Sequence, residues 1–324
     1  MFKEENQTLM EYTAVIRTLG TAGEKYQCLL DSLNQQTIAP QNILVYIAEK
    51  YPLPKETIGK ERYIYVKKGM VAQRALPYNE VDTEYILFLD DDVYLSPNSV
   101  ETLYTQLIAH QGDVISPDVF HNANRPQKAE LMLTLSGRMR ARRGDEVWGY
   151  KVMRTCGYSY NKRPKDVLKS QTNAGPCFFC KKQDFLNIRF EEELWLDAQK
   201  YPIGEDQVMF YKMYKKGLCV LTSYNSGIIH LDAGTTLASE EKEKALIFAD
   251  FRYKAIFWHR FIWSCEKNIF LKLWSLLCIG YAFAFALAIS LLKGEIHIFR
   301  IKRDAIKDGI RFQQSEAYKQ LPRI

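Results

Sequence analysis

The sequence predicts an α/β fold with a mostly parallel central sheet flanked by helices, followed by a helical region at the C-terminus. Short apolar runs alternate with stretches of helical apolar spacing over the first two thirds of the chain, which indicates βαβ units. One apolar run, residues 85–89, is followed directly by the carboxylates Asp90, Asp91 and Asp92. A later run, residues 273–292, contains no charged residue. The first observation predicts the fold class, and the other two mark a polar site and an apolar helix within it.

The expected strands are short apolar or β-branched runs, and the expected helices carry apolar residues three and four positions apart. The expected strands cover residues 11–19, 42–48, 62–66, 85–89, 113–116, 176–180, 218–223 and 228–230. The expected helices cover residues 25–36, 70–76, 96–110, 204–217 and 240–263. Pro77 ends the second helix, and Pro97 suits the first turn of the third. Gly217 is a natural C-terminal stop for the fourth helix.

The segment 120–172 does not follow this alternation. It is rich in arginine, lysine, asparagine and glycine, and a long irregular stretch in a compact domain is usually functional or mobile. Its cations could close over a diphosphate, or the segment could be a solvated surface loop. We also expect acceptor specificity to lie in this segment.

The acidic cluster stands where a parallel sheet usually binds its ligand. The run 85–89 is typical of a strand buried on both faces, and ligands of open α/β sheets bind beyond the carboxyl ends of such strands. In an extended chain Asp90 and Asp92 project to one side and Asp91 to the other. Two carboxylates on one side favour a divalent cation, with phosphate and water oxygens completing its shell. The alternative is a solvated acidic turn before the next helix.

Two further polar positions invite a functional and a structural interpretation. Glu205 and Asp206 lie at the start of the predicted helix 204–217. They could complement the helix dipole, or one of them could act as a general base toward a hydroxyl. His230 ends a short apolar run, where it could be structural or could serve as a neutral imidazole metal ligand.

Length, composition and charge limit the class of protein. The chain has 324 residues, 47% hydrophobic and 25% charged, which fits one large α/β domain with an appendage, or two domains. The net charge of +6 suits anionic ligands or an anionic membrane surface. The sequence contains no helix-turn-helix, zinc-finger or RNA-binding signature, so nucleic acid is not an expected partner.

The N-terminus and the cysteines indicate a cytosolic catalytic region. The opening stretch is polar, with Lys3, Glu4, Glu5 and Asn6 after the first two residues, so no signal peptide is expected. Seven scattered cysteines are typical of reduced thiols in the cytosol. Cys177 and Cys180 have the spacing of a metal site, but no second pair accompanies them. We therefore expect them to be core residues of a strand.

Taken together, these motifs resemble glycosyltransferase family 2, whose members have the GT-A fold. The resemblance covers roughly residues 11–231. Its parts, in chain order, are residues 15–18 of the first strand, 36–40 before the second, 69–74, the cluster 90–92 and the stretch 204–206. Within the family, the chain resembles the bacterial-type, membrane-associated, inverting members.

The resemblance implies transfer of a sugar from a nucleoside diphosphate donor with inversion at the anomeric carbon. It implies that Thr18, Arg74, Asp90 and Asp91 contact the donor. Asp92, with Asp90 and His230, would hold Mn²⁺ or Mg²⁺, which neutralises the leaving diphosphate. Asp206 would be the base, with Glu205 as the alternative.

One position departs from the family pattern. After the second strand the family usually has an aspartate pair that reads the base and ribose, and this chain has Ile47 and Ala48 there. Glu49 is the residue that could substitute. The resemblance suggests uridine as the base of the donor.

The C-terminal part, residues 237–324, predicts membrane attachment of a catalytic domain at 1–236. The uncharged run 273–292 has about the length needed to cross a hydrocarbon core, and Lys272 and Lys293 flank it. The tail after it is basic, so the positive-inside rule would keep both ends in the cytosol. A shallow helix, bent at Gly280, with residues 296–312 lying along the inner leaflet, would reconcile these features. The alternatives are a single span and a buried helix of a soluble dimer.

The leading hypothesis is therefore a transferase at the cytoplasmic face of the cell membrane. It would extend a lipid-linked or cell-surface glycan, with membrane lipids as further partners. Two alternatives are a nucleotidyltransferase that makes the nucleotide sugar, and a non-catalytic scaffold with the same fold. The turn after the first strand lacks the lysine-arginine character of a nucleotidyltransferase loop.

Overall fold

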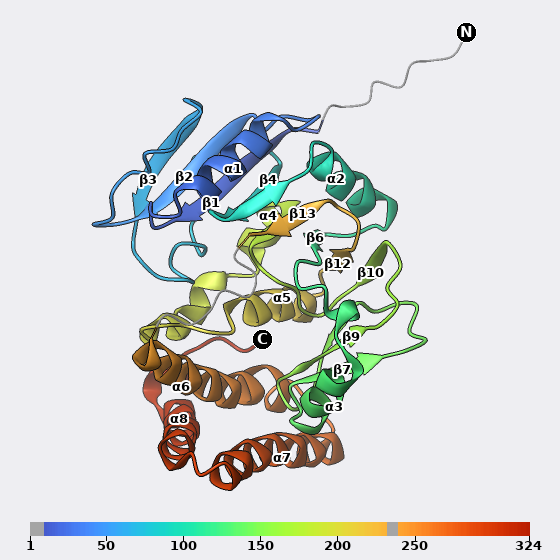
Figure 1. Ribbon diagram of the computed structural model, residues 1–324, viewed down its shortest axis with the longest axis vertical. Helices are drawn as coiled ribbons and strands as arrows, with labels where there is room; N and C mark the ends of the chain where they lie inside the picture. Colours follow the sequence, from blue (N-terminus) through green and yellow to red (C-terminus); the bar gives the residue numbers. More distant parts are fainter. Residues whose placement is uncertain (1–9, 232–238) are drawn as a thin grey trace.

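The computed structural model describes residues 10–231 and 239–324 (Figure 1). The N-terminal hexapeptide and the predicted domain boundary at 236–237 lie outside these ranges. The predicted α/β class is confirmed, because an eight-stranded, mostly parallel sheet forms the centre with helices on its faces. The strand order is β10-β12-β6-β11-β4-β1-β2-β3.

The N-terminal half of the sheet is parallel. β1 pairs with β2 on one side and β4 on the other, and β2 pairs with β3. The elements are β1 (Tyr12–Thr18), α1 (Glu24–Asn34), β2 (Asn42–Ala48), β3 (Glu61–Val66), β4 (Tyr85–Asp90), β5 (Val93–Leu95) and α2 (Ser99–Ala109). Since parallel strands share one carboxyl edge, Thr18 and Asp90 end at the same side of the sheet.

The second half mixes directions. β11 (Cys177–Lys181) runs antiparallel between β4 and β6 (Val114–Pro117), and β12 (Val220–Ser223) is parallel to β6. β10 (Val167–Lys169) closes this edge of the sheet. Cys177 and Cys180 are free and buried in β11, as the sequence predicts. The other elements here are α4 (Lys182–Asn187), the 3₁₀ segment η2 (Phe190–Ala198), α5 (Glu205–Lys215) and β13 (Ile228–His230), which pairs with β5.

Two local predictions are wrong. Residues 70–76 form a series of hydrogen-bonded turns, because only a few bonds such as Gln73 N to Gly69 O close before Pro77. The segment 120–172 is not irregular, because its short strands pair with each other and with β12. Side-chain hydrogen bonds from Arg142 and Asn161 to backbone carbonyls connect them further, and no local periodicity in the sequence reveals these contacts. The segment holds η1 (Asn122–Asn124), α3 (Gln127–Leu135), β7 (Met139–Arg142), β8 (Tyr150–Val152) and β9 (Tyr158–Asn161), besides β10.

The C-terminal helices pack on the sheet domain. One of the two hydrophobic clusters joins strand residues such as Phe88 and Phe178 to Phe257 and Phe261. The elements are α6 (Glu240–Phe257), a π-helical segment η3 (Trp258–Trp263), α7 (Ile269–Leu292), α8 (Ile296–Gln314) and α9 (Glu316–Lys319). Figure 1 shows α6, α7 and α8 at the end of the molecule opposite β3.

The structure corrects the predicted arrangement of the tail. α7 continues through Gly280 without a break. The apolar face of α8 packs against α6, where Gly309 lies so close that an added Cβ would meet Ala255 Cβ at 2.8 Å. An amphipathic pattern is the same whether its apolar face meets lipid or protein, and here it meets protein.

Candidate functional site

A cleft of about 800 Å³ opens at the carboxyl edge of β1 and β4. Asp90, Asp91 and Asp92 line one wall, as the strand–carboxylate pattern predicts. Arg17 and Thr18, the last two residues of β1, line the wall beside them. The remaining lining comes from the turns at 19–25 and 68–73 and from residues 197–202 and 246. The cleft therefore stands where open α/β sheets bind their ligands.

Arg17 orients Asp90 by a bidentate ion pair. Its Nε and Nη2 donate to Oδ1 and Oδ2 of Asp90 at 2.5 and 3.0 Å. Paired, fork-like contacts of this kind fix geometry as well as charge. Burial alone would raise the pKa of Asp90, but the guanidiniums of Arg17 and Arg74 hold it below its ordinary value. Asp90 is therefore an anion in a fixed orientation.

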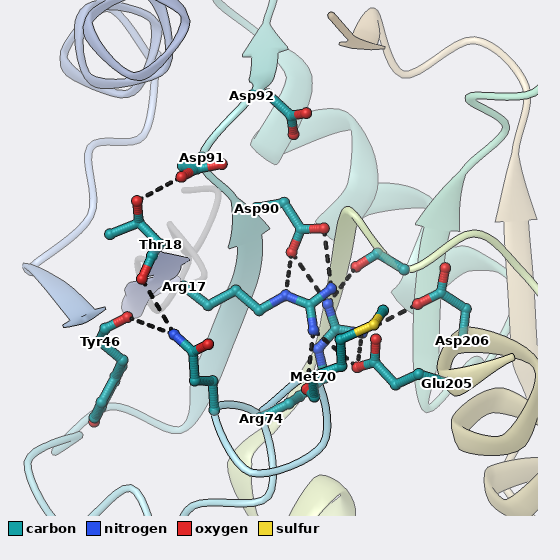
Figure 2. A network of polar contacts seen from close by, with 12 residues as sticks. Arg17, Thr18, Tyr46, Met70, Arg74, Asp90, Asp91, Asp92, Glu205 and Asp206 are labelled. Atoms are coloured by element: carbon teal, nitrogen blue, oxygen red, sulfur yellow. Dashed lines mark hydrogen bonds and ion pairs between the residues drawn. The ribbon is translucent and has the colours of Figure 1, made fainter. Parts of the chain in front are cut away.

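Arg74 joins this pair to the start of α5 (Figure 2). Its Nη2 donates to Asp90 Oδ1 at 3.2 Å and to the carbonyl of Gly175 at 2.9 Å. Its Nη1 lies 2.9 Å from Glu205 Oε1 and 3.3 Å from Asp206 Oδ1. Arg17 Nη1 also donates to Glu205 Oε1 at 2.9 Å. Two guanidiniums thus hold three carboxylates from two distant parts of the chain, and we call these five residues the cleft network.

The two carboxylates of α5 differ in access. The Glu205 side chain is 0% exposed, whereas that of Asp206 is 34% exposed. Burial raises the pKa of Glu205 to about 7 even though both arginines oppose this shift. Of these two carboxylates, only Asp206 has side-chain surface open to solvent, while Glu205 is enclosed against both arginines.

Two glycines allow α5 to approach the cluster. Gly204 precedes the helix with φ of 89°, and a Cβ there would meet the ring of Tyr253 at 2.4 Å. A Cβ at Gly175 would meet Asp206 Oδ1 at 2.0 Å. Since only glycine has no Cβ, both positions require it.

The other two aspartates turn away from the arginines. Thr18 Oγ1 donates to Asp91 Oδ2 at 2.5 Å. Burial raises the pKa of Asp91 to about 6, with the neighbouring carboxylates adding to the shift. Asp92 Oδ2 lies 3.1 Å from His230 Nε2, across the β5–β13 pair. The prediction that Asp90 and Asp92 project to the same side of an extended strand is wrong, because β4 ends at Asp90.

An oxygen and an imidazole nitrogen at this separation fit a divalent ion such as Mn²⁺ as two of its ligands. In residues 10–231 and 239–324 no group of three metal-ligating side chains is gathered. Both oxygens of Asp90 already accept hydrogen bonds from arginine. Asp92 and His230 are thus the residues that could hold such an ion, if other oxygens completed its shell.

Glu49 does not reach the cleft. It is exposed beyond the end of β2, its backbone nitrogen donates to Val66 O at 2.8 Å, and it is absent from the cleft lining among the described residues. The cleft wall near β2 is instead formed by Gln73, which donates to Thr18 O at 3.2 Å. The predicted donor contact of Glu49 is therefore not supported by its position.

Sequence reasoning assigned no role to several residues that build the site. Arg17 was visible as a charge inside an apolar strand, which is a signal for a buried ion pair. Asp197 accepts from the backbone nitrogens of Val71 and Ala72 at 3.0 and 2.9 Å and fixes the turn that carries Arg74. Lys68 lines the cleft and could meet an anionic ligand. No pattern near Asp197 could have identified its role, because its partners lie 125 residues or more away in sequence.

Comparisons with known proteins bear on the fold. The sequence matches no protein-family model and no curated protein. Among solved structures, S. aureus TarS 1–349 in complex with UDP-GlcNAc superposes with a TM-score of 0.51 at 13% identity, over 93% of this chain and 81% of that one. GalNAc-T7 with UDP, GalNAc and Mn²⁺ gives a TM-score of 0.48 at 13% identity, over 84% of this chain and 56% of that one. The similarity to TarS shows that the chain has a GT-A-like α/β fold.

Proposed function

We propose that the chain is an inverting glycosyltransferase of the family 2 type. It transfers a sugar from a UDP-linked donor to a hydroxyl of a lipid-linked or cell-surface glycan, with Mn²⁺ or Mg²⁺, at the cytoplasmic face of the cell membrane. The observation that carries this proposal is the cleft network, which links Asp90 at the cleft to a solvent-accessible Asp206 through one arginine. The TarS-like fold with a nucleotide-sugar ligand in that protein supports the donor class.

The site residues divide into a donor side and an acceptor side. Thr18 and Asp91, on the cleft wall, face the space for the nucleotide, and Arg17 and Arg74 hold Asp90 in place. A metal ion at Asp92 and His230 would supply positive charge to the diphosphate. Asp206 stands across Arg74 from the cleft, where an acceptor hydroxyl would approach.

The chemistry needs one base and no protein nucleophile. Asp206 accepts the proton of the acceptor hydroxyl while that oxygen bonds to the anomeric carbon of the sugar. The bond from that carbon to the diphosphate oxygen breaks, and its electron pair leaves with the diphosphate. A single displacement inverts the anomeric centre.

Membrane attachment is supported by α7. It is the one helix in the described part of the chain that is long and apolar enough to cross a membrane, and only 17% of its most apolar window is buried. Nucleotide sugars are cytosolic, which supports the cytoplasmic face. Placing the enzyme at a membrane would suit an acceptor carried on a lipid.

Substitution of Asp206 tests the proposal. Asp206→Asn removes the base but keeps the shape, so transfer should fall by about 10²–10⁴-fold, while UDP with Mn²⁺ should still raise the unfolding midpoint. A ligand at ~100 times its Kd stabilises by about 2.7 kcal/mol, which is readily measured. Asp304→Asn, an exposed aspartate of α8, is the control and should transfer normally.

Four results would contradict the proposal. Near-normal transfer by Asp206→Asn would show that Asp206 is not the general base. Release of pyrophosphate from a nucleoside triphosphate and a sugar phosphate would indicate a nucleotidyltransferase. The absence of any midpoint shift with a panel of nucleoside diphosphates and Mn²⁺ would indicate a scaffold. Retention of the donor's anomeric configuration in the product, measured by proton NMR, would exclude the inverting mechanism.

A further inference from the structure

The apolar helix α7 has its polar side facing the protein. The buried positions of α7 are Ser275, Ile279 and Ser290. The opposite face carries large apolar residues from one end to the other, Phe270, Trp274, Leu277, Tyr281 and Leu291. Phe270 is 77% exposed and Leu277 is 65% exposed. A surface helix in water would instead keep its exposed side polar.

α7 is attached to the rest of the protein along its whole length. Near its start Arg154 donates to Leu271 O at 3.3 Å, and Trp258 Nε1 donates to Ser275 O at 3.2 Å. In its middle the hydroxyl of Tyr281 donates to Leu135 O at 2.6 Å. Near its end Lys302 donates to Ser290 Oγ at 2.8 Å. At 24 residues the helix is about 36 Å long, but it could not cross a bilayer without carrying these attached elements into the lipid.

Helix α3 extends the same apolar surface. Leu131 and Met132 are 60% and 54% exposed, and Leu135 follows one turn later. The turn after α3 packs on α7, since a Cβ at Gly137 would lie 3.5 Å from Ala282 Cβ. Figure 1 shows α3 next to α7 at the same end of the molecule. We call the exposed apolar residues of α3 and α7 the α3–α7 surface. Monomeric soluble proteins rarely leave so much contiguous apolar surface exposed.

The residues around the α3–α7 surface are basic. Lys128 is exposed on α3, Arg138 and Arg140 are exposed just after it, and Lys267 and Lys293 are exposed at the two ends of α7. No acidic residue occurs between 267 and 294, and Glu130 of α3 is buried and paired with Lys162 and Arg143. Trp274 and Tyr281 are of the type found at membrane interfaces. Basic residues around an apolar face complement a leaflet that contains anionic lipid.

We propose that the α3–α7 surface docks on an anionic bilayer, with α7 lying in the plane of one leaflet at the boundary of headgroups and acyl chains. The protein is then held by one leaflet and does not span the membrane. This inference deepens the membrane attachment in the proposed function and does not depend on sugar transfer. It also gives the segment 120–172 a role, because α3 lies within it.

Vesicle co-sedimentation of the full chain tests the docking. Binding should be strong with vesicles that contain phosphatidylglycerol and at least tenfold weaker with phosphatidylcholine alone. Leu131→Ser with Met132→Ser should weaken binding about tenfold, and Trp274→Ser with Leu277→Ser should weaken it at least as much. Ile108→Ser is the matched control, because Ile108 is 54% exposed on α2 at the other end of the molecule and should change nothing. Unchanged binding by the α3 double variant would overturn the proposal.

The orientation of α7 is tested by an impermeant amine reagent on protein added to sealed vesicles. Lys267 and Lys293 flank the helix, and peptide mass mapping should find both modified. Protection of one of them until detergent is added would show a span and overturn the proposal. A different outcome would be a wild-type protein that does not bind vesicles and is a dimer in ultracentrifugation, with the α7 double variant a monomer. That result would show that the α3–α7 surface binds a second copy of the chain and would overturn the proposal. The shift of the unfolding midpoint by UDP with Mn²⁺ reports the proposed function separately in every variant.

Discussion

Two networks of buried charged residues share helix α5. They differ in whether a member is accessible to solvent, and this difference distinguishes a network suited to chemistry from one that only stabilises the fold. The cleft network uses Glu205 and Asp206 in the first turn of α5. A second network uses Lys212, two turns later, with Glu192, Glu193 and Arg260. We call this second group the closed network. It lies on the side of α5 that faces η2, η3 and the C-terminus.

The closed network satisfies its charges completely. Glu193 and Lys212 are fully buried, and Lys212 Nζ lies 2.8 Å from Glu193 Oε1 and from Glu192 Oε2. Arg260 donates to both oxygens of Glu193 at 2.8 and 2.9 Å and to Pro322 O at 3.0 Å. Two carboxylates thus face two buried cations, and the group connects the sheet domain to the chain end.

The cleft network has a different charge balance. Three carboxylates share two guanidiniums, and the third carboxylate, Asp206, is the most exposed of them, at 34% against 22% for Asp90. A balanced, enclosed network can only hold elements together, because no member reaches a ligand. In the proposed mechanism, the additional acid at the edge is the group that takes the proton. The comparison therefore predicts that substitutions in the closed network change stability, and that Asp206 changes transfer.

The largest stability effect is expected at Glu193. Glu193→Ala leaves Lys212 and Arg260 buried with fewer partners, and breaking a buried pair in this way costs about 3–5 kcal/mol. The free energy of unfolding in urea should fall by that amount, while transfer per folded molecule stays near normal. Glu191→Ala on the same segment η2 is the control, because Glu191 is half exposed. A loss of transfer greater than the loss of folded protein would show that the two networks are coupled.

The two networks should also respond to pH in opposite directions. Burial would raise the pKa of Glu193, but Arg260 and Lys212 hold it below its ordinary value, so its stabilising charge is lost as pH falls below about 4.5. The pKa of Glu205 is raised to about 7 from 4.5, so the native state binds a proton that the unfolded state has released. The contribution of Glu205 is therefore fully present below pH 4.5 and is lost as pH rises toward 7, by on the order of 3 kcal/mol at most.

Urea unfolding across pH 3.5–8 checks these signs. The difference in unfolding free energy between wild type and Glu205→Gln should decrease as pH rises from 4.5 to 7. The difference between wild type and Glu193→Gln should increase as pH rises toward 4.5 and then stay level. The same slope for Glu205→Gln and Glu193→Gln would contradict the contrast between the two networks.

The sequence predicted the parallel sheet and the cleft wall because their signals are local. A strand of apolar residues and the carboxylates after it are contiguous, so Asp90 to Asp92 could be placed at a sheet edge without knowing the fold. The contact of Arg17 with Glu205 spans 188 residues, and nothing near either residue specifies it. The closed network was missed for the same reason, since Glu193 and Arg260 are 67 residues apart.

The segment 120–172 and the tail show a second limit. Strands of three or four residues, such as β7 and β8, carry too few positions for a period to be recognised. The uncharged run of α7 was correctly predicted as a helix by its length, but its two inward serines and outward aromatics become meaningful only when its neighbours are known. The apolar stripe of α8 specified a buried face and left open what would bury it.

The smallest effect is expected at an ion pair that is only partly enclosed. Arg252 of α6 is buried and donates to Asp308 of α8 at 2.7 Å, but the Asp308 side chain is 43% exposed. Solvent screens such a pair, so Asp308→Asn should lower the free energy of unfolding by about 0.5–1 kcal/mol, against several kcal/mol at Glu193. If the slopes of the urea unfolding curves are unchanged, the shifts of the two variants' urea midpoints give the ratio of the two losses in unfolding free energy. A loss at Asp308 as large as that at Glu193 would mean that enclosure by protein is not what distinguishes the closed network.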